Sequence, residues 1–271
     1  MQPKNSKGQL TIIKALIKLT ISTFQNKEEG QMDPLKMARV PITKNDIIYY
    51  DNMGYLLVAD ILSSEKCDEI LEIYESHADE DFSQILNQDR EGVTEIRELM
   101  RLPRIVSTLD SLQRWKVDAV QSIILFKRAG SRYATQAWNP HQDNSYPQAP
   151  YPGYITANIF LADADRENGC MYLYPSSHKE PLLPFVETPS YKEPMGTNPG
   201  NTVEVPEEYL DKKVDLVIKR GSMLVLNSHL IHGSYPNNSS RSRPICSISY
   251  ITQGVEFRPG KNAKRIRINV H

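Results

Sequence analysis

Two histidine motifs, far apart in the chain, constrain its fold more than any other feature. The first is His141-Gln142-Asp143, and the second is His232 within Leu230-Ile-His-Gly-Ser234. In an extended strand alternate side chains share a face, so His141 and Asp143 are predicted to point the same way. Two imidazoles and one carboxylate form the facial triad of non-haem Fe(II) oxygenases. If His232 is the third ligand, the fold must bring the two segments together.

An arginine follows the second motif. Arg243 lies in Ser239-Ser-Arg-Ser-Arg-Pro-Ile-Cys-Ser-Ile-Ser-Tyr250, which predicts the strand after His232. A guanidinium there can bind a carboxylate through two parallel N–H groups. Three protein ligands leave three open positions on an octahedral ion, which suits a bidentate co-substrate and dioxygen. A dicarboxylic keto acid that chelates the iron at one end would need such an arginine at its other end.

Short strand patterns separated by glycine and proline turns predict a double-sheet barrel rather than an α/β fold. The strands are expected at 55–58, 118–127, 155–162, 170–174, 214–218, 223–226, 245–251 and 266–270, with helices at 44–52, after Ser63 and at 104–115. The apolar run Ile123–Phe126 predicts a strand that is buried on both faces. The charged residues 79–96 predict an exposed loop.

These motifs resemble the phytanoyl-CoA dioxygenase family of Fe(II)/2-oxoglutarate oxygenases, in the family's order and at its usual separations. The resemblance covers about residues 45–254. The matching stretches are Gln121–Lys127, Pro140–Asp143, Glu167–Met171, Pro175–His178, and His232–Ser234 with Arg243. It implies a mainly β fold with flanking helices, the double-stranded β-helix (jelly roll, cupin-like).

The resemblance also implies roles for single residues. His141, Asp143 and His232 match the family's iron ligands, and Arg243 matches the residue that binds the distal carboxylate of 2-oxoglutarate. Asn158 and Ile123 fall where the family lines the co-substrate pocket. Members that halogenate have a small residue in place of the acidic ligand. The presence of Asp143 therefore implies oxygenation.

The implied activity is that of an Fe(II)/2-oxoglutarate-dependent dioxygenase. Such an enzyme would use dioxygen to hydroxylate an aliphatic C–H of a small molecule and would convert 2-oxoglutarate to succinate. Two alternatives stay open. The same cofactors could support desaturation, cyclisation or epimerisation, or the chain could be a non-catalytic jelly roll that binds a metal or a ligand. No residue in the sequence indicates which small molecule is the substrate.

The segments around the first motif offer candidate substrate contacts. These are Trp138, Asn144 and Tyr146. Residues 144–154 combine prolines with tyrosines, which predicts a stiff pocket wall or, alternatively, a rigid surface loop. Residues 181–206 are rich in proline and show little periodicity, and we interpret them as a lid over the iron.

Two other histidines need separate interpretations. His229 competes with His232, but residues three apart lie on opposite faces of a strand, so both cannot face the metal. We favour His232 because Gly233-Ser234 follows it and because it stands at the family's distance from Arg243. His178 is expected to cap or hydrogen-bond within the Pro-Ser-Ser-His turn.

Composition excludes some classes of partner and compartment. The net charge of −1 over 271 residues and the absence of a basic stripe argue against a nucleic-acid partner. Three cysteines without CxxC spacing favour a reducing compartment. We expect a small-molecule substrate, no transmembrane segment, and a monomer or weak homo-oligomer.

Residues 1–42 form a predicted N-terminal extension, an amphipathic helix plus a linker, before a catalytic domain at 43–271. Leu10, Ile13 and Ile17 recur at helical spacing, while Lys14 and Lys18 interrupt the apolar run and exclude a spanning helix. The helix could pack on the domain, act as a targeting peptide, or lie on a membrane surface. We expect a cytoplasmic protein, with organelle targeting through residues 1–27 as the alternative.

Overall fold

The computed structural model divides the chain into two units, Met1–Asp33 and Pro34–His271. It describes residues 32–75, 84–86, 94–131, 134–187, 201–259 and 265–271. The expected amphipathic helix therefore lies outside the described residues.

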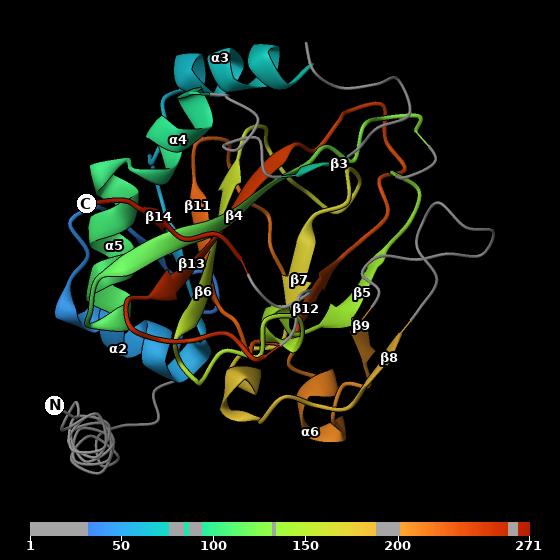
Figure 1. Ribbon diagram of the computed structural model, residues 1–271. Helices are drawn as coiled ribbons and strands as arrows, with labels where there is room; N and C mark the ends of the chain where they lie inside the picture. Colours follow the sequence, from blue (N-terminus) through green and yellow to red (C-terminus); the bar gives the residue numbers. More distant parts are fainter. Residues whose placement is uncertain (1–31, 76–83, 87–93, 132–133, 188–200, 260–264) are drawn as a thin grey trace, which may run out of the picture. The chain divides into compact units, whose positions relative to one another are not determined.

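Two antiparallel sheets form the framework of the second unit (Figure 1). The larger sheet contains, in order, β1 (Met37–Ala38), β2 (Tyr55–Val58), β11 (Met223–Asn227), β6 (Tyr154–Phe160), β13 (Ile245–Thr252), β4 (Val117–Leu125) and β14 (Ile268–Asn269), with β3 (Gln84–Leu86) also paired to β4. The smaller sheet contains β10 (Val214–Asp215), β7 (Met171–Leu173), β12 (His232–Ser234) and β5 (Trp138–His141). A separate ribbon pairs β8 (Phe185–Glu187) with β9 (Asn201–Val203). One pair departs from the antiparallel pattern, since β1 runs parallel to β2.

The chain alternates between the two sheets. Strands β4, β6, β11 and β13 belong to the larger sheet, while β5, β7 and β12 belong to the smaller one. This alternation is the jelly roll that the sequence predicts. It lets residues distant in sequence meet between the sheets, because each crossing returns the chain to the same interior.

Helices cover the outer face of the larger sheet (Figure 1). They are α2 (Lys44–Met53), α3 (Ser64–Glu75), α4 (Thr94–Met100) and α5 (Pro103–Gln113), while α6 (Glu207–Leu210), η2 (Asp143–Ser145) and η3 (Ser177–Lys179) are short turns elsewhere. Two of these helices have capping residues at their ends. Gly54 ends α2 with a φ of 84°, and the Ser63 hydroxyl accepts a hydrogen bond from the Lys66 N–H at the start of α3.

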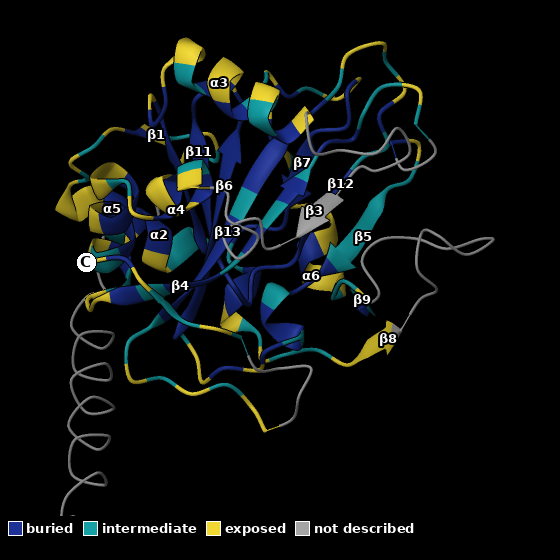
Figure 2. Cartoon of the chain, turned by 45° about the horizontal axis from the view of Figure 1, so that its top comes forward, coloured by how far each residue is buried: buried dark blue, intermediate teal, exposed yellow. Residues whose placement is uncertain are grey.

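Strand β6 shows how the sequence divides its faces. Ile155, Ala157 and Ile159 belong to the core that packs under the helices, whose inner sides are buried in Figure 2. Thr156 and Asn158 alternate with them and face the space between the sheets. The polar residues of this strand therefore point toward the interior of the barrel.

Two predictions about local structure are wrong. Residues 84–86 form β3 and residue 94 begins α4, within a stretch that its charge predicts as a loop. Strand β4 is not buried on both faces: Ile124 is buried against the core, whereas Ile123 and Leu125 are half-buried. The reason is the neighbouring layer, because helices cover one face of β4 while the other faces the interior.

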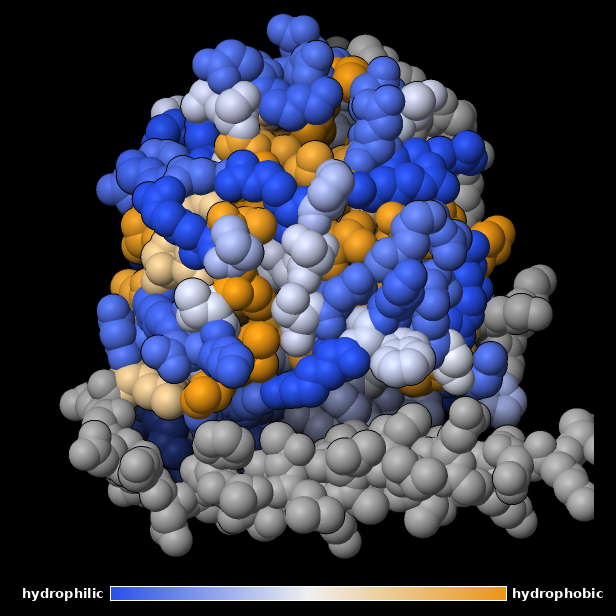
Figure 3. Space-filling view, turned by 90° about the vertical axis from the view of Figure 1, so that its left-hand side faces the viewer, coloured by the Kyte–Doolittle hydropathy of each residue, from blue (hydrophilic) through white to orange (hydrophobic). Residues whose placement is uncertain are grey.

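The surface over the helices is mostly hydrophilic, with apolar side chains between the polar ones (Figure 3). Apolar atoms contribute much of any folded surface, so this mixture is ordinary. Within the described residues, no helix combines the length and the apolar character that crossing a bilayer requires.

Candidate functional site

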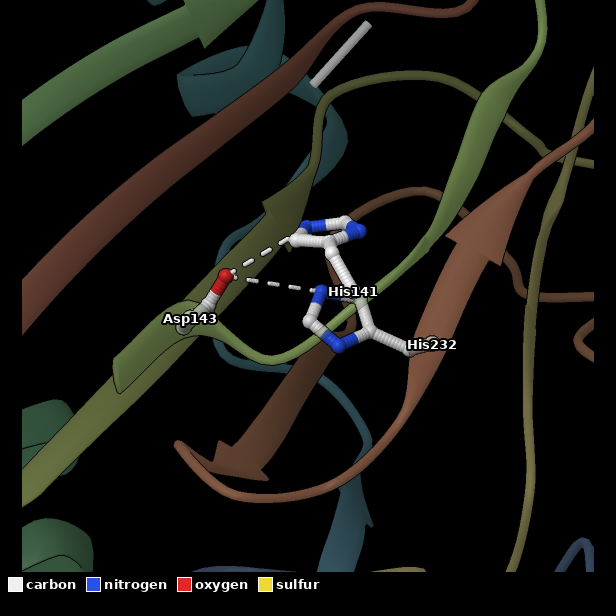
Figure 4. A group of neighbouring side chains, drawn as sticks. All are labelled: His141, Asp143 and His232. Carbon is white, nitrogen blue, oxygen red and sulfur yellow. Dashed lines mark ion pairs between the residues drawn. The ribbon is translucent and has the colours of Figure 1, made fainter. Parts of the chain in front are cut away.

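The three residues predicted to bind metal meet between the sheets (Figure 4). His141 ends β5 and pairs in register with His232 at the start of β12. The Nε2 atoms of His141 and His232 lie 3.5 Å and 3.6 Å from Asp143 Oδ1. One ligand atom from each residue lies within 4.8 Å of the other two. The side chains thus converge on a volume that suits one cation.

Hydrogen bonds fix the orientation of both imidazoles. His141 Nδ1 is 2.9 Å from the Asn139 carbonyl, and His232 Nδ1 is 3.0 Å from the Leu230 carbonyl. A carbonyl can only accept, so we assign the ring proton to Nδ1 in each case. Both Nε2 lone pairs then face Asp143, as in metal sites whose histidines donate their other N–H to the backbone.

Asp143 is held in the charged form. Burial alone would raise its pKa, but the two neighbouring imidazoles and the hydrogen bond from Thr156 lower it below its usual range. Thr156 Oγ1 donates to Asp143 Oδ2 at 2.7 Å, which leaves Oδ1 facing the histidines. Burial lowers the pKa of His232 to about 4, so this ring is neutral at pH 7. A neutral imidazole and an ionised carboxylate are the forms that bind a metal.

The backbone around Asp143 differs from the sequence prediction. Strand β5 ends at His141, and Asp143 begins the turn η2, so the prediction of one continuous strand is wrong. Gln142 between them is extended, with φ −118° and ψ 123°, and this single residue keeps His141 and Asp143 on the same side.

Gln142 points away from the site and fastens it to two other segments. Its Nε2 donates to the His229 carbonyl at 2.8 Å and to the Pro181 carbonyl at 3.1 Å. Its Oε1 accepts from the Leu183 N–H at 2.8 Å. The buried amide therefore ties the ligand segment both to the turn before β12 and to the segment that leads into β8.

His229 does not join the metal group. Its Nδ1 is 3.1 Å from the Glu180 carbonyl, and its Nε2 is 3.0 Å from Asn144 Nδ2. The structure thus brings the favoured His232 to the site, although the reason differs from the prediction. His229 lies in the turn before β12 rather than on a strand, so its own hydrogen bonds keep it away.

Two other residues, His178 and Gly233, lie near this turn. His178 lies in η3 and has the predicted hydrogen-bonding role, but its partner lies outside the Pro-Ser-Ser-His turn: its Nε2 is 3.0 Å from the Asp51 carbonyl of α2. Gly233 separates His232 from Ser234, and a Cβ there would lie 2.5 Å from the Trp138 carbonyl oxygen. Any larger residue would push β12 away from β5, so the paired histidines depend on this glycine.

The residues assigned to the co-substrate lie on the larger sheet. Ile123 of β4, Ser247 of β13 and Asn158 of β6 are cross-strand neighbours in one row. Asn158 is buried, and its Nδ2 makes no hydrogen bond within the described residues. Arg243 is 2 % exposed and precedes β13, where its N–H donates to the Phe126 carbonyl at 3.1 Å.

The three candidate substrate-contact residues differ in where their side chains lie. The ring of Trp138 lies 5.8 Å from that of His141. The Tyr146 phenol bonds to the Asn201 backbone, and burial together with the Asp143 charge raises its pKa to about 12. Asn144 instead points into the protein, where its amide donates to the Ala149 carbonyl and accepts from the Ala149 N–H.

The sequence prediction missed Thr156, whose hydroxyl donates to Asp143. Thr156 lies two residues before Asn158, so the two residues share a face of β6. The period of two along a strand was the signal that could have found it.

Comparison with known proteins agrees with this geometry. The phytanoyl-CoA dioxygenase family model matches residues 50–245 of the chain. The chain belongs to the phytanoyl-CoA dioxygenase family. The predicted family is therefore confirmed, and the match includes the three clustered side chains and Arg243.

Curated relatives carry the same family name. Phytanoyl-CoA dioxygenase 1 of Oryza sativa subsp. japonica is 33% identical over 157 residues, which cover 56% of this chain and 52% of the rice protein. The peroxisomal phytanoyl-CoA dioxygenase of Bos taurus is 27% identical over 167 residues, covering 60% of this chain and 48% of the bovine protein. The chain thus matches about half the length of these relatives.

Solved structures share the fold. The epimerase SnoN from nogalamycin biosynthesis, in complex with Fe3+, alpha ketoglutarate and nogalamycin RO, superposes with a TM-score of 0.65 at 19% identity, covering 79% of this chain and 85% of SnoN. The carbocyclase SnoK gives a TM-score of 0.66 at 18% identity, covering 85% and 95%. These similarities confirm the predicted jelly roll of phytanoyl-CoA dioxygenase family members.

Proposed function

We propose that the chain is an Fe(II)/2-oxoglutarate-dependent dioxygenase that hydroxylates an aliphatic C–H of a small molecule. One observation carries the proposal: two imidazole Nε2 atoms and one carboxylate oxygen converge between the two sheets. Two neutral imidazoles and a carboxylate are the ligand set of non-haem Fe(II) oxygenases.

The donor set fits iron. His141, His232 and Asp143 would hold the metal, because the backbone carbonyls behind the rings and the Thr156 hydroxyl behind the carboxylate leave one donor atom of each facing inward. When iron, 2-oxoglutarate and dioxygen are bound, they supply the oxidising chemistry, and 2-oxoglutarate leaves as succinate and carbon dioxide.

The interior also fits the co-substrate. A buried guanidinium favours a carboxylate partner, and Arg243 would bind the distal carboxylate of 2-oxoglutarate. A buried amide donor without an acceptor among the described residues favours a ligand oxygen, which Asn158 Nδ2 would meet. Ile123, in the same row, would pack against the methylene groups between the two carboxylates.

The protein's own contribution would be position and exclusion of water. Trp138 lies beside His141, and Tyr146 follows Asp143 by three residues; both side chains would help to orient the substrate C–H. Residues 201–203 of β9 belong to the predicted lid at 181–206, and Asn201 bonds there to Ser145 at 3.1 Å. Residues 188–200 of that lid lie outside the described residues.

The first experiment is anaerobic addition of Fe(II) and then 2-oxoglutarate, followed by visible spectroscopy. We expect a metal-to-ligand charge-transfer band that is lost in His232→Ala and requires far more 2-oxoglutarate in Arg243→Ala. Wild-type protein that stays folded, binds iron and shows no band would contradict the proposal. Succinate release that persists undiminished in His141→Ala would contradict the ligand assignment.

A different oxidative outcome is the second candidate. SnoN and SnoK, which share the fold, are described as an epimerase and a carbocyclase. Outcome depends on where the substrate C–H lies relative to the iron, which the ligand set does not fix. Product analysis by mass separates the two, because hydroxylation adds one oxygen atom and epimerisation leaves the mass unchanged. A non-catalytic binding role would instead show 2-oxoglutarate binding without any turnover.

We also propose a cytoplasmic location and a monomer or weak homo-oligomer. A bovine relative is described as peroxisomal, so organelle targeting through residues 1–27 is the alternative. Imaging the full chain and a chain without residues 1–27 separates these locations: an organelle signal that requires residues 1–27 would contradict the cytoplasmic proposal.

A further inference from the structure

Lys127 is a fully buried cation outside the proposed metal site. It follows β4, its relative exposure is 0 %, and its Nζ donates to the Gln136 carbonyl at 3.2 Å and to the Tyr235 carbonyl. Buried lysines usually pair with a carboxylate, because moving an isolated charge out of water is costly. In the described part of the chain, no carboxylate forms a salt bridge with this lysine.

The backbone of Lys127 is linked to Arg243. The Arg243 N–H lies 3.1 Å from the Phe126 carbonyl oxygen and 3.4 Å from that of Lys127, which also accepts from Asn237 Nδ2 at 2.9 Å. Lys127 has a φ of 36°, in the left-handed region that residues with a side chain rarely adopt. The bend holds the lysine side chain inside while its backbone braces the arginine.

Burial and the Arg243 charge both disfavour the charged form of Lys127. Burial lowers the pKa of Lys127 well below its usual value, and the Arg243 guanidinium lowers it further. Among the described residues, the one other titratable group that acts on Lys127 is the Cys170 thiol, whose own pKa burial raises to about 11. At pH 7 the thiol is neutral, so neither neighbour stabilises the charged form of Lys127. An anion bound nearby would.

The position of the pair matches the far end of a dicarboxylate. His232 and Ser234 share a face of β12, and the Tyr235 carbonyl that Lys127 holds comes next along the chain. Arg243 leads into β13, whose Ser247 lies beside Asn158. The Lys127 ammonium therefore lies beyond Ser234, on the side of β12 that leads away from His232, and its backbone lies against that of Arg243.

We propose that Lys127 is a second positioning residue for the co-substrate, supplying a positive charge beside Arg243 that selects a dicarboxylic over a monocarboxylic keto acid. This inference rests on the proposed function, since it assumes that 2-oxoglutarate binds between the metal ligands and Arg243. It goes further in assigning part of the co-substrate affinity to a residue that acts through charge and through the carbonyl groups it holds.

The test compares 2-oxoglutarate with 2-oxobutyrate, which lacks the distal carboxylate, by anaerobic titration of the Fe(II) charge-transfer band. Lys127→Met keeps the length of the side chain and removes its charge, and Lys116→Met is the matched control at an exposed position. We expect Lys127→Met to lower the affinity for 2-oxoglutarate by about 15- to 100-fold, which is the effect of one charge at about 6–10 Å in a protein interior. Binding of 2-oxobutyrate should change by less than about threefold.

The outcomes separate the two proposals. No band in the wild-type protein would defeat the proposed function itself. A wild-type band with equal 2-oxoglutarate affinity in Lys127→Met would overturn the inference alone, and so would equal weakening of both keto acids, which is the mark of a purely structural role.

A second variant decides the matter if Lys127→Met does not fold. Arg243→Gln removes the other cation, and the remaining Lys127 should then preserve a preference for 2-oxoglutarate over 2-oxobutyrate of at least about fivefold. Complete loss of that preference in folded Arg243→Gln would show that Lys127 supplies no selectivity and would overturn the inference.

Discussion

Single residues behind the ligands decide whether the candidate metal site is ready to bind. The Asn139 and Leu230 carbonyls fix the imidazoles, and the Thr156 hydroxyl fixes the carboxylate. Partners of this kind commonly change metal affinity by about 10- to 100-fold when they are removed. Their effect can be measured apart from any catalytic assay.

Thr156→Val tests the bond behind Asp143. The substitution keeps the shape of the side chain and removes the donor to Oδ2, so the carboxylate becomes free to turn. We expect the affinity for Fe(II) or Ni(II), measured by calorimetry, to fall about 10- to 100-fold with the fold intact. Thr108→Val is the control, because this buried threonine donates to the Arg104 carbonyl within α5, away from the metal ligands. Equal metal affinity in the two variants would contradict the role of Thr156.

A buried histidine predicts acid sensitivity of the metal-free protein. Burial lowers the pKa of His178 to about 4, while an unfolded chain binds the proton near pH 6.5. Between these values the unfolded state holds more protons, so the free energy of unfolding falls as the pH falls, by up to about 1.4 kcal/mol per pH unit from this group. Urea denaturation at pH 7 and pH 5 should show a smaller decline in His178→Gln. The same decline in both proteins would contradict the assignment.

At the scale of elements, the junction between α2 and β2 fits closely against the segment before β12. Gly54 ends α2 with positive φ, and its carbonyl accepts the Asn227 N–H at 2.8 Å. A Cβ on Gly54 would lie 2.4 Å from His178 Nδ1 and 2.8 Å from Leu230 Cδ1. The helix end and the turn that carries His232 are therefore packed without room for a methyl group.

Gly54→Ala should be far more harmful than the same change at a matched glycine. Gly254 has a φ of +83°, and no described atom lies within 4 Å of the position that a Cβ would take there. Gly254→Ala therefore carries only the backbone cost of about 1–2 kcal/mol. Gly54→Ala adds overpacking, typically about 1–3 kcal/mol more. Denaturant unfolding of both variants measures the difference. An equal fall in the free energy of unfolding would mean that the His178 and Leu230 side chains move away from the added methyl group at little cost.

At the scale of the whole molecule, a metal that binds only the folded chain must stabilise it. We expect Ni(II) at about 100 times its dissociation constant to add about 2.7 kcal/mol to the free energy of unfolding. For a domain of this size that corresponds to a rise in Tm of about 5–10 °C. The rise should vanish in His232→Ala and persist in His271→Ala. A rise that survives His232→Ala would place the metal elsewhere.

The boundary of the catalytic domain is a second property of the whole chain. Strand β1 pairs with β2, and Lys36 Nζ lies 2.7 Å from Asp46 at the start of α2, although β1 and Lys36 precede the expected boundary at 42. A chain that begins at Pro34 should keep the wild-type Tm. In a chain that begins at Thr43, the free energy of unfolding should fall by about 3 kcal/mol and the Tm with it, because β1 and the packed Val40 and Ile42 are removed. Equal Tm values for these two chains would contradict a domain boundary at Pro34.

The sequence by itself determined the family, the jelly roll and the residues that meet at the site. His141, Asp143 and His232 form a two-histidine, one-carboxylate ligand set that is typical of one class of metal site, so the residue types and their spacing were informative. Helix ends were also readable, because the Ser63 hydroxyl and the Gly54 backbone act on groups a few residues away.

Only the tertiary structure decided what depends on distant neighbours. The half-burial of Ile123 follows from which layer covers each face of β4, and β3 forms because β4 offers it an edge. The bond from Thr156 to Asp143 and the approach of Lys127 to Arg243 join segments that no local pattern connects. The physical reason is the range of the forces involved. Strand period and capping act over a few residues, whereas burial, desolvation and charge are set by whatever the completed fold brings within a few ångströms.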